Sequence, residues 1–308
     1  MYLPGIYMAS TDGMGLDPQV SLRGFYGGGE AEYMKVLIDG IPVNNLENGL
    51  ATWNLLPLGQ INRVELLRGG SSPLYGDAAM GGVINLRTDR GEPDFTNASI
   101  GYGSFNTYNI GAAHGGKIGS GTYELYAGNN STDGFREHSK WNSINFGGKV
   151  KLPVSRNSFL TFSTYNQILS SEDPGFWSDT LIGSSRDESL PYFREDGKDF
   201  QKFLVNLGFK TAVNPNTNLS IDLNYQHNNR EITRTFAQYP IILVPTGEFQ
   251  YYQSGVNTDT TIFGDTKRRE INTDQISFAV RTLTDIPEIR ARITGGIEAE
   301  YGGFDNSY

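Results

Sequence analysis

The feature that most constrains the fold is an alternation of apolar and polar residues that begins near Asp94 and continues to the end of the chain. It occurs in segments of about nine to eleven residues, the length that a tilted β-strand needs to cross the hydrocarbon of a bilayer. Successive side chains of a strand point to opposite faces, so each segment has one apolar face and one face carrying Asp, Glu, Lys and Arg. The pattern predicts a sheet with one face against lipid or a core and the other against water.

The alternation predicts about nine strands, each with its own apolar row. The rows are Ala98, Ile100 and Tyr102; Tyr108, Ile110 and Ala112; Tyr123, Leu125 and Ala127; Ile144, Phe146, Gly148, Val150 and Leu152; Leu160 and Phe162; Phe203, Val205, Leu207 and Phe209; Leu219, Ile221, Leu223 and Tyr225; Ile276, Phe278 and Val280; and Ile289, Ala291, Ile293, Ile297, Ala299 and Tyr301. In the fifth segment Phe159 competes with Leu160 and Phe162 for the apolar face.

The connectors between these segments favour a membrane barrel over a soluble sandwich. After a first short link at 103–106, short turns are expected near Lys117, 153–157, 213–217 and 284–288, and long loops at 129–142, 167–199 and 229–270. Short turns on one rim and long loops on the other are the layout of an outer-membrane barrel. Because single-chain bacterial barrels close with an even number of strands, a count of about nine leads us to expect a truncated barrel.

Composition narrows the partners and the location. A formal net charge of −9 argues against nucleic acid, whose phosphates are bound by clustered Lys and Arg. The chain has no cysteine and therefore no disulfide or thiolate metal site. Its first residues have neither the basic nor the apolar region of a signal peptide, so either the mature protein starts here or its front is missing. No stretch approaches the ~18 apolar residues of a membrane helix, so any bilayer crossing uses strands.

Residues 1–90 lack this pattern and are expected to form a small α/β domain that precedes the strands of 91–308. Within it, 61–88 holds two short apolar segments around a glycine-rich loop, as tight turns with positive φ require. Residues 35–38 are expected to form a strand that turns at Asp39-Gly40 and returns along 41–43, at a sheet edge because Pro42 lacks an N–H. A helical turn is expected within 49–56.

Three ordered motifs in this domain carry a family resemblance. They are Val20-Ser21-Leu22-Arg23-Gly24-Phe25; Val36-Leu37-Ile38-Asp39-Gly40-Ile41-Pro42-Val43; and the group Arg63, Glu65, Arg68-Gly69, Tyr75-Gly76 and Gly81-Gly82-Val83-Ile84-Asn85. With them the chain resembles the TonB-dependent outer-membrane receptors, from the C-terminal half of the plug into the N-terminal part of the barrel. Gly70 departs from the family pattern, in which proline is more usual, and either residue can end a strand.

The resemblance implies a mainly β fold, in which an incomplete transmembrane antiparallel β-barrel of about nine strands follows a small α/β plug domain. It also implies the bacterial outer membrane as location and outer-membrane lipid as surroundings. The implied function is an active importer and not an enzyme. A TonB-type energy-coupling protein, acting through a segment that is not in this chain, would shift the plug after ligand binds from outside. No cofactor is implied.

The usual cargo of the family is a ferric siderophore, with cobalamin, haem and oligosaccharide as alternatives. A secreted β-rich carbohydrate-active enzyme or adhesin is the alternative from another class, although no carboxylate pair is singled out by its spacing. A passive porin is disfavoured by the plug-like front.

The plug signature supplies the first set of candidate site residues, which are Arg23, Gly24, Asp39, Gly40, Arg63, Glu65, Arg68, Gly69, Tyr75, Gly76, Gly81 and Gly82. The resemblance implies that its arginines bond to carboxylates on the barrel wall and lock the plug in the lumen. Glu124, Glu298 and Glu300 are candidate wall partners, and ordinary salt bridges within the plug are the alternative.

Ligand contacts are expected on the plug loops and the long outer loops. The candidates are Tyr26, Glu30, Glu32, Tyr33, Asn45 and Trp53 in the plug, and Phe176, Trp177, Tyr239, Tyr251 and Tyr252 in the outer loops. Aromatic faces could stack on the rings of a chelate, whereas the alternative is that they pack the loops or mark the interfacial girdle. His114, His138 and His227 have no metal-ligand spacing, and the glycine-rich loop lacks the lysine of a phosphate-binding loop.

Overall fold

The computed structural model describes two sheets and the segments around them. The described residues are 5–10, 18–22, 33–46, 61–70, 79–88, 94–175, 193–236, 241–243, 249–251 and 265–307, together with Gly49, Ala51, Trp53, Leu56, Tyr75 and Ser189. No helix among these residues is long and apolar enough to cross a membrane. Every statement on structure below concerns these parts of the chain.

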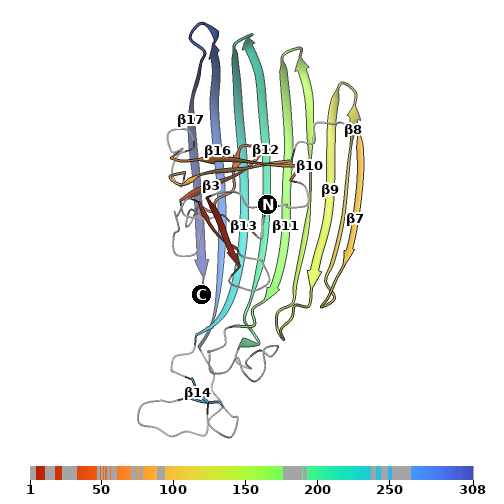
Figure 1. Ribbon diagram of the computed structural model, residues 1–308, viewed down its shortest axis with the longest axis vertical. Coiled ribbons are helices and arrows are strands. Elements are labelled where there is room, and N and C mark those ends of the chain that lie inside the picture. The colour runs from red at the N-terminus through yellow and green to blue at the C-terminus, as the bar shows by residue number, and fades with distance from the viewer. Residues whose placement is uncertain are drawn as a thin grey trace.

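The larger sheet, here called the wall sheet, has nine strands that all run antiparallel to their neighbours (Figure 1). They are β7 (Phe95–Tyr102), β8 (Tyr108–Ile118), β9 (Gly121–Thr132), β10 (Trp141–Ser155), β11 (Ser158–Glu172), β12 (Gly197–Asn214), β13 (Thr217–Phe236), β16 (Asp265–Ile286) and β17 (Ala291–Ser307). Each strand pairs with the next one in sequence, as in an up-and-down barrel wall. The predicted nine strands are confirmed. The 3₁₀ turn Pro287–Ile289 joins the last two.

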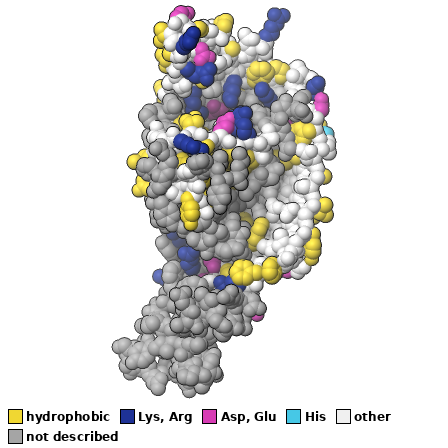
Figure 2. Space-filling view, viewed as in Figure 1, with side chains coloured by type: hydrophobic (Ala, Val, Ile, Leu, Met, Phe, Trp, Pro, Cys, Tyr) yellow, Lys and Arg dark blue, Asp and Glu magenta, His cyan; other side chains and the backbone are white. Residues whose placement is uncertain are grey.

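The two faces of the wall sheet are reversed relative to a soluble protein. The predicted apolar rows are exposed, as Leu125, Phe146, Leu207 and Phe278 illustrate, and Figure 2 shows hydrophobic side chains along the margin where β7 to β9 lie. The alternate side chains are buried although they are polar. They include Asn145, Gln167, Asn206, Asn224 and Asn228. Broad exposed apolar rows are foreign to soluble domains and normal against lipid, so the face assignment is confirmed and a covered sandwich is not what forms.

From β10 onward the wall strands are longer than the sequence pattern predicts. β12, β13 and β16 have 18, 20 and 22 residues, and the long loops shrink accordingly to 133–140, 173–196 and 237–264. The prediction of about nine to eleven residues per strand holds to within one residue for β7, β8 and β9, which have 8, 11 and 12 residues. It was wrong for the later strands because it tracked apolar rows, which end where the strands leave the hydrocarbon. Beyond that point the regular outward apolar row is absent, and pairing continues through the backbone ladder, for example between Glu231 and Glu270.

The smaller sheet, here called the plug sheet, is built from β3 (Met34–Ile38), β4 (Ile41–Pro42), β5 (Arg63–Arg68) and β6 (Gly82–Arg87). The strand order is β4-β3-β6-β5, in which only the β3–β6 pair is parallel. The predicted hairpin around Asp39-Gly40 is confirmed, and β4 with Pro42 lies at the edge. Leu56 N donates to Trp53 O at 3.1 Å, a single turn in the region where a helical turn was expected.

Two further strand pairs are small. β1 (Ile6–Ser10) pairs with β2 (Pro18–Leu22), and β14 (Ile241–Leu243) pairs with β15 (Phe249–Tyr251).

The plug sheet lies across the inner face of the wall sheet, with its strands at a steep angle to the wall strands (Figure 1). A single hydrophobic cluster contains plug residues such as Leu22, Val36 and Ile38 together with Tyr165 of β11 and Leu204 of β12. Because these side chains are nearly inaccessible to solvent, apolar burial holds the plug sheet against this part of the wall.

Candidate functional site

The candidate site is the junction between the Asp39-Gly40 turn and the wall. Asp39 and Gly40 have φ of 53° and 91° and form the two-residue loop between the paired Ile38 and Ile41. Positive φ at both central residues defines a type I′ hairpin turn, for which Asp-Gly is a favoured dipeptide. Asp39 N also donates to Leu86 O at 2.9 Å, which ties the turn to β6. The turn therefore holds the Asp39 carboxylate in a fixed orientation at the end of the plug sheet.

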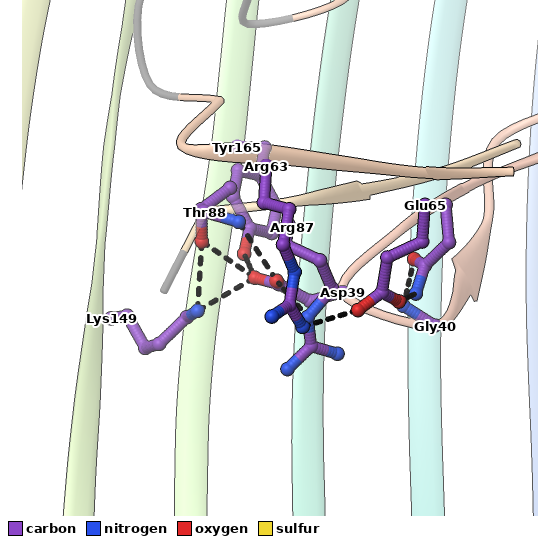
Figure 3. A network of polar contacts seen from close by, with 9 residues as sticks. Asp39, Gly40, Arg63, Glu65, Arg87, Thr88, Lys149 and Tyr165 are labelled. Atoms are coloured by element: carbon purple, nitrogen blue, oxygen red, sulfur yellow. Dashed lines mark hydrogen bonds and ion pairs between the residues drawn. The ribbon is translucent and has the colours of Figure 1, made fainter. Parts of the chain in front are cut away.

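Four donors from three segments converge on this carboxylate (Figure 3). Thr88 donates its backbone N–H to Oδ1 at 3.0 Å and its hydroxyl to Oδ2 at 2.6 Å. Lys149 of β10 donates Nζ to Oδ2 at 2.6 Å, and Tyr165 of β11 donates its hydroxyl to the same oxygen at 2.6 Å. Two neighbouring wall strands thus bind one plug side chain. We call Asp39, Thr88, Lys149 and Tyr165 the clasp.

The clasp contains a buried ion pair, and both carboxylate oxygens of Asp39 accept hydrogen bonds. The side chains of Asp39 and Lys149 are 12% and 13% exposed. Burial raises the pKa of Asp39, but the Lys149 ammonium and the hydrogen bonds from Lys149, Thr88 and Tyr165 outweigh burial and bring that pKa from 3.8 down to about 2. Lys149 Nζ donates to Thr88 Oγ1 as well, at 2.8 Å. The carboxylate is therefore charged at neutral pH, and charge-assisted hydrogen bonds of this kind are roughly twice as strong as neutral ones.

A second set of polar contacts connects the turn to β5 inside the plug. Gly40 N donates to Asn85 Oδ1 at 3.0 Å, and Asn85 Nδ2 donates to Glu65 Oε2 at 2.8 Å. Glu65 in turn forms an ion pair with Arg63 on the same strand (Figure 3). Displacement of β5 would therefore disturb the turn that carries Asp39, through the bonds from Asn85 to Glu65 and from Gly40 to Asn85.

The plug meets the wall at two further described points. Lys202 of β12 is buried and donates Nζ to the backbone oxygen of Val43 at 3.2 Å. Next to the clasp, a cavity of about 20 Å³ lies between Thr88 and the wall, and Glu124 and Tyr126 of β9 are among its lining residues. A space of this volume is large enough for one water molecule, and Thr88, Glu124 and Lys149 are polar groups in its otherwise largely apolar lining.

The structure brings some of the sequence-predicted site residues together. Asp39, Gly40, Arg63 and Glu65 belong to the connected network just described. Gly69 and Gly82 have φ of 105° and 147° at the ends of β5 and β6. Tyr75 packs near Leu37, Ala79 and Val83, and Arg68 pairs with Gly82 in the ladder. Arg23, Gly24 and Gly76 lie outside the described residues.

The other predicted residues lie elsewhere. Arg63 contacts Glu65 within the plug, Glu298 pairs with Arg281 at 3.0 Å, and Glu300 accepts from Gln275 at 2.7 Å. Among the ligand candidates, Tyr33 is exposed, Asn45 is buried, and Trp53 packs against the plug core. Tyr251 belongs to β15. Tyr26, Glu30, Glu32, Phe176, Trp177, Tyr239 and Tyr252 lie outside the described residues. The lock and ligand roles of all these residues stay predictions.

Sequence reasoning did not identify Lys149, Tyr165, Thr88 or Lys202 as site residues. Their inward direction can be read from the alternation, since Lys149 and Tyr165 alternate with apolar rows on β10 and β11. The signal that could have singled out Lys149 is that it is a cation on the inner face of a wall facing an acidic plug turn. Which wall strand meets that turn is set by tertiary packing and is not written in either segment.

Comparison with known proteins agrees with this architecture. Residues 1–83 match the family model described as the TonB-dependent Receptor Plug Domain. A vitamin B12 transporter BtuB of Vibrio vulnificus is 30% identical over 188 residues, which are 58% of this chain and 28% of that protein. The chain therefore spans little more than a quarter of the length of this relative.

Two solved structures share the fold. The ferripyoverdine receptor of the outer membrane of Pseudomonas aeruginosa, bound to ferripyoverdine, superimposes with a TM-score of 0.73 at 15% identity over 98% of this chain and 39% of its own. The ferric citrate transporter FecA in the unliganded form gives a TM-score of 0.64 at 16% identity over 99% of this chain and 56% of its own. At these identities the likeness concerns the fold alone.

A plug sheet tied to the inner face of an up-and-down wall, the apolar outward rows and the match to the plug model lead to one assignment. Residues 1–83 match a TonB-dependent receptor plug domain, and the chain as a whole is similar to the TonB-dependent receptors, whose plug-and-wall fold it shares.

Proposed function

We propose that the protein is a TonB-dependent importer in which the clasp holds the plug against the wall until an energy-coupling partner displaces it. The observation that carries this proposal is the convergence of Lys149 and Tyr165, from two wall strands, on the carboxylate of Asp39. In this proposal residues 1–90 act as the plug domain and 91–308 as the barrel wall. The plug signature residues keep the turn, the strand ends and the β5 contacts in the arrangement that the clasp needs.

A clasp of this type suits a gate that must be closed at rest and open under force. Removing one partner from a buried ion pair costs about 3–5 kcal/mol, because the other charge is left without compensation. The hydrogen bonds of the clasp need donor–acceptor distances of about 3 Å, so a movement of a few ångströms breaks them. A partner that pulls the plug needs to overcome this barrier once. Among the described contacts, the apolar contact with Tyr165 and Leu204 and the hydrogen bond from Lys202 to Val43 O then remain.

The proposed cargo is a ferric siderophore, bound from outside by plug loops that include Tyr33 and by the outer loops. Aromatic and polar side chains in such loops can contact the rings and oxygen atoms of a chelate. Cobalamin is the second candidate, because the relative with 30% identity is named a vitamin B12 transporter. The two solved neighbours carry the names of receptors or transporters for ferripyoverdine and ferric citrate.

The test is uptake by cells in which this protein is the only receptor of its class. Cells are given radiolabelled iron chelates or radiolabelled cyanocobalamin, with and without a functional TonB-type partner. We expect surface binding in both backgrounds and accumulation only when the partner is present. Accumulation that does not depend on the partner, or an absence of both binding and uptake for every chelate and for cobalamin, would reject the proposal.

A further inference from the structure

Four polar side chains on the inner face of β13 and β16 form a compact group, here called the amide patch. They are Gln226, Asn228, Thr273 and Gln275, which are 3%, 1%, 1% and 6% exposed. The strand register places Asn228 opposite Thr273 and Gln226 opposite Gln275, so the four occupy two adjacent rungs of the ladder. They are therefore neighbours on one face of the wall sheet.

The amide patch is unusual because most of its polar atoms have no hydrogen-bond partner. Both amide atoms of Gln226, both of Asn228, Thr273 Oγ1 and Gln275 Oε1 are buried and unpartnered in the part of the chain that the structure describes. Buried polar atoms are almost always bonded to protein or to ordered water. The polar atoms of this cluster are therefore available to form hydrogen bonds with water or with the polar groups of a solute.

The neighbouring rung shows that this is not a general property of amides on the wall. There Asn206 donates to Asn224 at 2.5 Å, and Asn224 donates to Ser277 at 3.1 Å. That rung has the same kind of side chains and the same strands, yet its side chains bond to one another. The amide patch lies on the same inner face and lacks such a chain.

The position of the patch relates it to the plug. Tyr165, Leu204, Gln226 and Gln275 are aligned across β11, β12, β13 and β16. The first two pack in the hydrophobic cluster of the plug core. From Leu204 on β12 to Gln226 on the next strand, β13, the inner face of the wall therefore changes from apolar contact with the plug to amide atoms without a hydrogen-bond partner.

We propose that the amide patch binds the neutral hydroxyl or amide groups of a small solute, together with its water, between plug and wall. The patch offers carboxamide N–H donors, carboxamide oxygen acceptors and a hydroxyl, and its four side chains are uncharged. The carboxylate of Glu300 on β17 is already bonded to Gln275 Nε2, at 2.7 Å. Lys202 lies opposite Asn228, but its ammonium is directed at Val43 O. Neutral polar groups satisfy donors and acceptors at once, whereas hydrocarbon satisfies none. Only the idea that this solute is imported cargo rests on the proposed function.

The test uses single cysteines in the membrane-inserted protein, in a background where the introduced thiol is the only one. The 308 residues contribute no cysteine of their own. Thr273→Cys is nearly isosteric and reports on the patch, and Leu204→Cys is the control. The two native side chains are matched in exposure at 1% each, and both face inward. A difference in labelling rate between the two thiols therefore reports on which reagent reaches each position and not on the exposure of the native side chains.

Each variant is treated with a hydroxyethyl or a benzyl methanethiosulfonate. The thiolate attacks the reagent's sulfenyl sulfur, forms a mixed disulfide and releases methanesulfinate. After normalisation to the rate with a free thiol, we expect hydroxyethyl labelling of Thr273→Cys to be at least about tenfold faster than that of Leu204→Cys, because polar solutes enter a polar site. The benzyl reagent is expected to show no such preference.

Equal hydroxyethyl rates at the two positions, or a benzyl preference at Thr273→Cys, would overturn the proposal. Asn228→Cys, on the opposite strand, is a second reporter that must follow the same pattern if Thr273→Cys does not insert into the membrane. The assay needs neither cargo nor energised membranes. Failure of labelling therefore rejects the patch and leaves the importer proposal standing, whereas labelling without partner-dependent uptake rejects only the importer proposal.

Discussion

Replacement of Asp39 by asparagine isolates the contribution of the clasp charge, because the two side chains have nearly the same shape. The amide oxygen of the Asp39→Asn variant could still accept from Thr88 N–H, but the Lys149 ammonium would lose the carboxylate that lies 2.6 Å from its Nζ. Lys149, whose side chain is 13% exposed, would then be without its counter-charge from the plug. We therefore expect Asp39→Asn to loosen the junction without altering the fold of the plug sheet.

The magnitude follows from the electrostatics of the clasp. The decrease of the Asp39 pKa from 3.8 to about 2 corresponds to roughly 2 kcal/mol of preferential stabilisation of the charged carboxylate. Breaking a buried pair by removing one member gives an upper range of about 3–5 kcal/mol. We expect about 2–4 kcal/mol, which is a factor of roughly 30 to 1,000 in the equilibrium for local opening.

Hydrogen–deuterium exchange in detergent-solubilised protein measures this opening. The Thr88 amide donates to Asp39 Oδ1, so a peptide that contains it should exchange faster by a similar factor in Asp39→Asn. Asp222→Asn is the control, because Asp222 pairs with Arg281 on the wall at 3.8 Å and belongs to no plug contact described above. Exchange at Thr88 that rises less than about twofold, or that rises equally in the control, would refute the reasoning.

Three further outcomes are expected. The Asp39 pKa lies below its ordinary value, so the clasp contributes fully to the stability of the folded state above about pH 4, and this contribution is lost as the pH falls through about 2. The check is the denaturation midpoint, which should drop in this pH window in the natural protein and not in Asp39→Asn. Gly82→Ala should destabilise the plug by about 1–3 kcal/mol, because φ is 147° and a Cβ would clash with Leu67 O, whereas Gly70→Ala, with 3.9 Å of clearance, should change the melting temperature little. Arg68→Ala is expected to impair uptake and leave surface binding within about twofold, because a plug lock acts after binding; equal loss of both rejects a lock role.

Much of the wall could be predicted from the sequence because lipid imposes a strict rule on it. Every second residue of a spanning strand faces hydrocarbon, so rows such as Phe203 to Phe209 and Ile276 to Val280 indicate their face directly. The strand ends could not be predicted in this way. Between Gln226 and Thr235 the one apolar residue of β13 is Ile232, so the apolar row of period two disappears while the ladder continues.

The site was only half predictable for a related reason. The Asp39-Gly40 turn is local, and its type I′ geometry follows from the dipeptide and the flanking strands. Its partners Lys149 and Tyr165 are 110 and 126 residues away, and their choice depends on how the plug sheet is rotated against the wall. Sequence reasoning placed the cations on the plug, whereas the clasp has the carboxylate on the plug and the cation on the wall.

The long polar ends of the wall strands have a consequence for what the cell presents to its surroundings. From Asp265 to Asp274, β16 continues past its last lipid-facing apolar residue, Ile276. At about 3.3 Å per residue and a tilt of about 40°, this stretch raises the rim by about 25 Å, well above the headgroup layer. Along β13 and β16 this part of the rim is therefore a hydrogen-bonded ladder, stiffer than a loop and clear of the lipid.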